Sequence, residues 1–158
     1  MNELNTFLWF DDQAEEAATF YVSLLDDGRI TLIDHYGSAG PGVEGTVKTV
    51  TFELGDHRLM ALNGGGAYSF NESVSLMIRC GTQADVDRLW ERLTADGGQA
   101  GPCGWLKDRY GLSWQIVPEL LFELVHDENR AKAEAVMAAM LQMGKIDSAA
   151  LQAAYDEG

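Results

Sequence analysis

The residues best suited to chemistry in this sequence lie close together between positions 101 and 118. Cys103 offers a thiol, and the consecutive residues Lys107, Asp108 and Arg109 offer an ammonium group, a carboxylate and a guanidinium. A thiolate beside cationic groups is a nucleophile, and charged side chains can exchange protons with a substrate. If the chain is an enzyme, these four residues are its candidate catalytic groups. A small buried thiol is the ordinary structural interpretation of Cys103.

Other motifs lack the context that their chemistry needs. Segment 40–45 has the glycine spacing of a dinucleotide-binding loop, but a strand follows it instead of a helix whose N-terminus would hold a pyrophosphate. Ser113 lacks the closing glycine of a nucleophile elbow. The histidines His35, His57 and His126 are scattered, and we expect them to be surface side chains.

Composition narrows the classes of partner. The chain has 158 residues and a net charge of −14, so it repels phosphate backbones and anionic lipids, and we expect neither nucleic acid nor a membrane surface as a partner. Its two cysteines, Cys80 and Cys103, form neither a zinc pattern nor a disulfide framework. The first residues carry no basic flank and no long apolar run. These features predict a cytoplasmic protein with reduced thiols.

The candidate residues are positioned by a predicted hairpin over 101–118. Apolar and polar residues alternate on its second arm, which is typical of a half-buried strand. If Trp114 and Ile116 point into a core, then Ser113, Gln115 and Val117 point to the opposite face of the sheet.

The chain upstream of this hairpin repeats one plan twice. The pattern predicts a strand, a helix and then two or three strands, first in residues 1–66 and again in residues 67–118. Each copy has one helix to cover one face of its sheet, so two copies could pair through their other faces as a cup. We therefore predict an α+β fold of two βαβββ modules that form a curved sheet cup, within one structural domain.

Residues 119–158 have a different pattern and predict a tail of three helices. The second helix has a methionine-rich face, which can bind peptides but more often packs within its own domain or against a second subunit. We expect the tail to pack on the same domain or on a dimer partner.

Four stretches resemble the vicinal oxygen chelate superfamily, which includes glyoxalases, bleomycin resistance proteins and dioxygenases. They are residues 7–11, the helix that ends at Phe20 and Tyr21, residues 61–65 and residues 101–118. The stretch 101–118 is similar to the PhnB-like branch, often labelled 3-demethylubiquinone-9 3-methyltransferase-like, and the resemblance extends over nearly all of residues 3–150. It implies βαβββ modules around a cup, and a homodimer.

Enzymes of this superfamily hold a metal in the cup through His and Glu side chains on four strands. Alignment with that pattern implies that the four positions are Thr6, Ala61 or Asn63, Ser75 and Gln115. None of these is an acid, an imidazole or a thiol, and hydroxyls and amides alone bind divalent ions poorly. We therefore expect no metal and no other cofactor, and metal-dependent chemistry of the superfamily is not implied.

Our main hypothesis is a PhnB-like protein that binds a small organic ligand in the cup without a metal centre. The residues expected to line the cup are Thr6, Trp9, Asn63, Ser75, Trp105 and Gln115, with Cys103, Lys107 and Arg109 as further polar contributors. The first alternative is an enzyme of the same superfamily, a lyase, dioxygenase or methyltransferase-like protein. The second is a protein-interaction module that acts through the helical tail.

Overall fold

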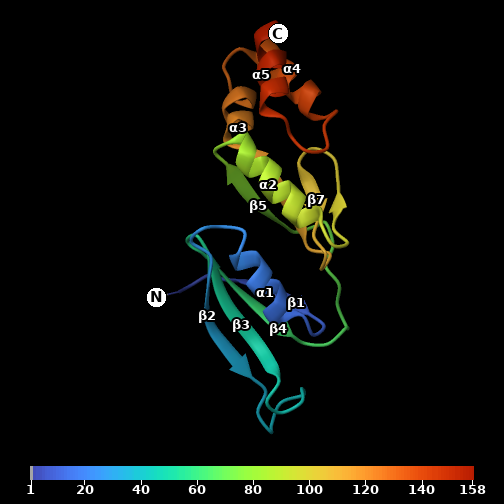
Figure 1. Cartoon of the computed structure of the whole chain (residues 1–158). Coiled ribbons are helices and arrows are strands. Elements are labelled where there is room, and N and C mark those ends of the chain that lie inside the picture. The colour runs from blue at the N-terminus through green and yellow to red at the C-terminus, as the bar shows by residue number, and fades with distance from the viewer. Residues whose placement is uncertain (1) are drawn as a thin grey trace. The chain divides into compact units, whose positions relative to one another are not determined.

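The computed structural model describes residues 2–158. The chain divides into two compact units, and the boundary along the chain falls between Ser69 and Phe70. Figure 1 shows the elements of both units along the chain. Each unit is built around one four-stranded sheet. Among the described residues, no helix is both long and apolar enough to cross a membrane.

The first unit has the order strand, helix and three strands. Its elements are β1 (Thr6–Phe10), α1 (Ala14–Val22), β2 (Arg29–His35), β3 (Val47–Leu54) and β4 (His57–Asn63). The strands lie in the order β1-β4-β3-β2, with β1 parallel to β4 and the other pairs antiparallel.

The second unit repeats this arrangement. Its elements are β5 (Ser75–Cys80), α2 (Gln83–Thr94), β6 (Gln99–Ala100), β7 (Trp105–Lys107) and β8 (Ser113–Pro118). The strand order is β5-β8-β7-β6, and β5 is parallel to β8. The predicted α+β fold with two βαβββ modules is therefore confirmed.

Alternating apolar residues form the core of each unit. In the first, Phe52 and Leu59 are register partners on β3 and β4, and both are fully buried with Ala17 and Tyr21 of α1. Removing a buried phenylalanine side chain such as that of Phe52 costs about 3–5 kcal/mol.

In the second unit, Trp114 and Ile116 of β8 are buried together with Val86 and Leu89 of α2, as the alternation predicted. The helix begins at the predicted cap, because the Thr82 side chain accepts a hydrogen bond from a backbone amide in its first turn. One face of the second sheet is therefore covered by α2. The side chains that alternate with Trp114 and Ile116 along β8 point to the other face; they are Ser113, Gln115 and Val117.

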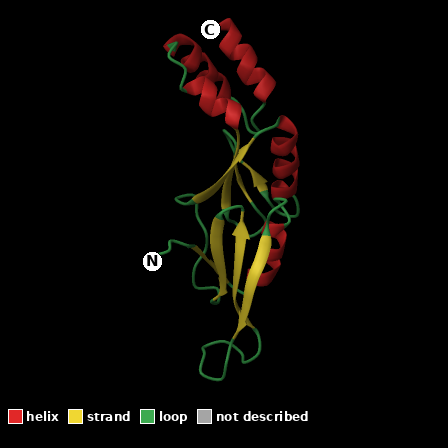
Figure 2. Ribbon diagram, turned by 90° about the vertical axis from the view of Figure 1, so that its left-hand side faces the viewer, coloured by secondary structure: helices red, strands yellow, loops and turns green. Residues whose placement is uncertain are grey.

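The tail consists of α3 (Glu119–Val125), α4 (Arg130–Met140) and α5 (Ser148–Glu157), as predicted. Figure 2 shows these helices grouped at the C-terminal end of the chain. They share a small core with the end of β8. Its buried members are Val117, Leu121, Leu124, Val136, Ile146 and Leu151.

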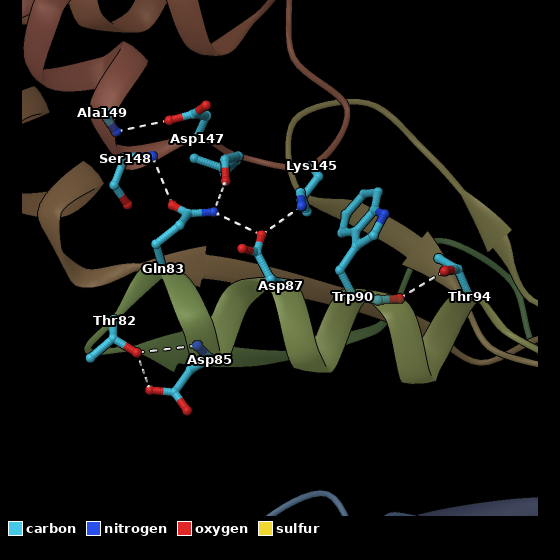
Figure 3. A network of polar contacts seen from close by, with 11 residues as sticks. Thr82, Gln83, Asp85, Asp87, Trp90, Thr94, Lys145, Asp147, Ser148 and Ala149 are labelled. Atoms are coloured by element: carbon cyan, nitrogen blue, oxygen red, sulfur yellow. Dashed lines mark hydrogen bonds and ion pairs between the residues drawn. The ribbon is translucent and has the colours of Figure 1, made fainter.

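The tail is also bound to α2 by polar contacts (Figure 3). The Gln83 amide donates to the carbonyl of Ile146 at 3.0 Å and accepts from the Ser148 amide at 2.8 Å. Lys145 pairs with Asp87 at 2.5 Å. The tail therefore packs on the second unit of its own chain.

Candidate functional site

The face of the second sheet opposite α2, called here the α2-distal face, carries a row of polar side chains. Strand register places Gln99 beside Lys107, Lys107 beside Ser113, and Ser113 beside Ser75. These four residues come from β6, β7, β8 and β5, so the row crosses the whole sheet. It combines amide, ammonium and hydroxyl groups.

A second row lies next to the first on the same face. Trp105 is beside Gln115, and Gln115 is beside Met77. The Gln115 side-chain amide donates to the Ser75 hydroxyl at 2.9 Å and so links the two rows. Trp105 is half-buried and Met77 is exposed, so this row offers apolar surface beside the amide.

The tail contacts the far end of the same face. The Arg79 guanidinium of β5 lies 4.4 Å from the centre of the Phe122 ring of α3. Arg79 is the register partner of Val117, which is buried in the tail core. These tail contacts lie at the end of the face opposite to the one that carries Ser75 and Ser113.

A hollow of about 220 Å³ opens at the end of the face that carries Ser75 and Ser113. Its lining includes Glu72, Trp105, Lys107 and Ser113. Lys107 forms an ion pair of 2.5 Å with Glu72, and its hydrogen bond holds the pKa of the Glu72 carboxyl below its usual value. Ser113 is only 1% exposed, and its hydroxyl has no hydrogen-bond partner in the structure. The lining of the hollow therefore includes a residue, Ser113, whose hydroxyl group donates no hydrogen bond within the protein.

Three residues expected to line the cup, Ser75, Trp105 and Gln115, are brought together on the α2-distal face. The neighbouring Ser113 and Glu72 were not predicted as site residues. The alternation of apolar and polar residues predicts that Ser113 lies on the same face as Gln115. The lack of a hydrogen-bond partner for its hydroxyl depends on tertiary packing, which a sequence pattern does not show.

Two of the three expected residues in the first unit lie on the side of their sheet that α1 covers. The Asn63 amide lies at the N-terminus of α1, where its oxygen accepts from the Ala14 amide at 2.7 Å and its nitrogen donates to the Val47 carbonyl at 3.1 Å. Thr6 shares the face of β1 that carries the buried Leu8, and its hydroxyl lies 3.0 Å from the imidazole of His57. Both therefore belong to the helix-covered side.

Trp9 lies on the other face of β1, by the same alternation. Its indole N–H donates to the Gly65 carbonyl at 2.7 Å, and its ring meets the Tyr68 ring edge-on at 5.0 Å. Trp9 thus has partners in its own unit.

The further polar contributors do not converge on one point. Lys107 pairs with Glu72, whereas Arg109 pairs with Asp96 at 2.8 Å. Cys103 is partly exposed, and its backbone amide donates to the Met143 carbonyl at 2.8 Å.

The positions that the superfamily uses for a metal do not suit one here. Asn63 and Gln115 use their amides in hydrogen bonds within the protein, and the side chains of Thr6 and Asn63 lie on the helix-covered side. Over residues 2–158, no three His, Cys, Asp or Glu side chains gather closely enough to hold a metal ion. The donor set therefore does not fit the metal that the superfamily implies.

A larger hollow of about 580 Å³ lies in the first unit, at the start of α1. Its lining includes Asp11, Asp12 and Glu15, together with Tyr36. The three acidic side chains are exposed to solvent, where carboxylates are well hydrated. Their placement follows from the preference for acidic residues in the first turn of a helix.

The two βαβββ modules define the class of this chain, which has the vicinal oxygen chelate fold. The family model described as 3-demethylubiquinone-9 3-methyltransferase matches residues 2–117. The chain belongs to this PhnB-like family. The match ends before the tail, so the resemblance to the family does not include α3, α4 and α5, contrary to our expectation from the sequence.

Solved structures agree with this assignment. A Bacillus cereus PhnB protein, whose description also names 3-demethylubiquinone-9 3-methyltransferase, is 34% identical, with 74% of this chain and 99% of that chain covered and a TM-score of 0.66. A Pseudomonas aeruginosa protein shares the fold alone: it is 20% identical, with 75% of this chain and 98% of that chain covered and a TM-score of 0.62.

A more distant structure shares the fold alone. The fosfomycin resistance protein FosX from Mesorhizobium loti is 16% identical over 73% of this chain and 90% of that chain, with a TM-score of 0.51. No curated protein matches the chain.

Proposed function

We propose that this chain binds a small organic ligand on the α2-distal face of its second sheet, without a metal centre. The observation that carries the proposal is the pair of neighbouring rows on that face, which combines hydroxyl and amide groups with the half-buried indole of Trp105. Ligand sites typically combine apolar surface with a few fixed polar groups. The Gln115–Ser75 hydrogen bond holds two such groups in place.

The catalytic alternative has less support from the geometry. Asp108 is 2% exposed, and its carboxylate accepts hydrogen bonds from the Tyr110 and Leu112 amides and from the Trp114 indole. A carboxylate that is buried and accepts three hydrogen bonds stabilises a turn and is shielded from a substrate.

Titration of the ¹⁵N-labelled full-length protein with small aromatic and aliphatic compounds tests the proposal. A ligand on this face should shift the side-chain N–H signals of Gln115 and Trp105. Gln115→Ala should weaken its binding about tenfold, because a fixed polar contact is lost. Gln142→Ala, at an exposed position in the tail, is the matched control and should leave binding unchanged.

Metal analysis of the purified protein is the second arm of the experiment. We expect less than stoichiometric zinc, nickel or iron. A stoichiometric metal, or ligands that shift other signals and leave both Gln115 and Trp105 unmoved, would contradict the proposal.

A further inference from the structure

The hydroxyl of Ser113 is the feature that points beyond the proposed function. Buried hydroxyl groups are nearly always hydrogen-bonded, and each exception needs a physical explanation. Ser113 is 1% exposed and its Oγ has no partner, although it lines the hollow beside Lys107. A missing ligand atom that accepts a hydrogen bond would satisfy this group.

The neighbouring cation shows which charge that ligand atom should carry. Lys107 is the register partner of Ser113 on β7, so the ammonium and hydroxyl groups belong to the same row. Lys107 is already paired with Glu72 at 2.5 Å, and the Glu72 side chain is 63% exposed. Exposed ion pairs are weak, so a ligand anion can replace the Glu72 carboxylate at little cost.

We infer that the hollow holds the acid group of a small organic acid, whose carboxylate replaces Glu72 at Lys107 and accepts a hydrogen bond from Ser113. The inference rests on the proposed function and names the chemical class of its ligand. A volume of about 220 Å³ is smaller than a typical site for a whole drug-sized ligand, so it suits the acid end of such a molecule. The remainder would lie against Trp105 and near Gln115.

The positive charge of Lys107 is important for the binding of an acid by this protein. The net charge of −14 opposes the approach of any anion, so binding of an acid depends on the ammonium group at the site itself. Glu72 is then an internal competitor for that ammonium group. Removing its charge should therefore strengthen acid binding, an outcome that a damaged fold cannot produce.

Benzoate, benzamide and phenyl phosphate are suitable probes, titrated into the full chain and its variants while the signals of Gln115 and Trp105 are followed. Benzoate should bind more tightly than its neutral isostere benzamide. Lys107→Gln and Ser113→Ala should each weaken benzoate binding about tenfold, because each removes a hydrogen bond to a charged group. Glu72→Gln should strengthen it several-fold, and the matched control Glu91→Gln on α2 should leave it unchanged.

The outcomes separate the two proposals. If benzamide binds as tightly as benzoate and Glu72→Gln has no effect, the acid assignment is wrong while ligand binding on this face stands. If phenyl phosphate binds more tightly than benzoate, the group is a phosphate and the carboxylate assignment is overturned. If no compound of any class shifts Gln115 or Trp105, the proposed function fails and this inference fails with it.

Discussion

The carboxylate of Asp108 accepts a hydrogen bond from the indole N–H of Trp114 at 2.8 Å. Its other oxygen accepts from the Tyr110 and Leu112 amides at 2.8 and 3.1 Å. Asp108 therefore joins the turn between β7 and β8 to the largest side chain in the core of the second unit. An acidic residue beside two basic ones suggests chemistry in the sequence, but its burial makes it a structural group.

Asp108→Asn should reduce the free energy of unfolding by about 1–3 kcal/mol, because an amide NH₂ would face the Trp114 N–H and leave buried donors without an acceptor. Urea denaturation measures this change. Asp56→Asn, at an exposed position in the β3–β4 turn, is the control and should change stability by no more than about 0.5 kcal/mol. Equal effects of the two substitutions would show that the buried hydrogen bonds contribute little.

Asn63 should be essential for the start of α1. The N-cap residue Gln13 makes no side-chain capping bond, whereas the Asn63 amide accepts from Ala14 and donates to Val47. Asn63→Ala should therefore cost about 1–3 kcal/mol and increase amide hydrogen exchange in α1. Gln13→Ala should leave exchange unchanged, and exchange in α2 serves as the internal reference. Protection of α1 that survives Asn63→Ala would contradict this role.

The sequence predicted the fold well because local patterns determine it. Strict alternation around Trp114 and Ile116 was enough to assign the faces of β8, and the Thr82 side chain caps α2 as expected. Internal repetition predicted two modules, and their identical strand orders confirm it.

The candidate site was predicted less completely, because strand parity and hydrogen-bond partners depend on tertiary structure. A shift of one residue moves a strand side chain to the other face, which explains why Thr6 and Asn63 lie on the helix-covered side instead of beside Trp9. The ion pair of Lys107 joins it to Glu72, a residue 35 positions earlier. No local pattern in the sequence indicates that contact.

The Gln83 amide should determine how firmly the tail is attached to α2 (Figure 3). Gln83→Ala removes the hydrogen bonds to Ile146 and Ser148, so it should expose residues 143–158 to protease and speed hydrogen exchange in α5. Lys145→Ala removes only an exposed ion pair and should have little effect, about 0–1 kcal/mol. Faster cleavage in Lys145→Ala than in Gln83→Ala would reverse this ranking.

The two thiols should differ in reactivity. Burial raises the pKa of Cys80 to about 11, whereas Cys103 is partly exposed. At pH 8 an alkylating reagent should therefore modify Cys103 in the native protein, and Cys80 only after unfolding. Mass spectrometry of peptides after timed alkylation measures this difference.

The raised pKa of Cys80 also predicts a dependence of stability on pH. Between the unfolded value of about 9 and the folded value of about 11, the native state binds more protons than the unfolded state. Stability contributed by this thiol is therefore full below pH 9 and is lost as the pH rises through 11. Cys80→Ala should remove that part of the alkaline loss in urea denaturation. An unchanged alkaline profile in this variant would assign the loss to other groups.

Two serines that are register partners should respond differently to substitution by alanine. Ser75 accepts a hydrogen bond from Gln115, so Ser75→Ala should destabilise the protein by about 1 kcal/mol. Ser113 is buried with no partner for its hydroxyl, so Ser113→Ala should leave the free energy of unfolding unchanged or raise it by about 1–3 kcal/mol. Urea denaturation without ligand measures both. A larger loss in Ser113→Ala than in Ser75→Ala would mean that the hydroxyl is already satisfied within the protein, which would remove its role as a donor kept for the acid group of a ligand.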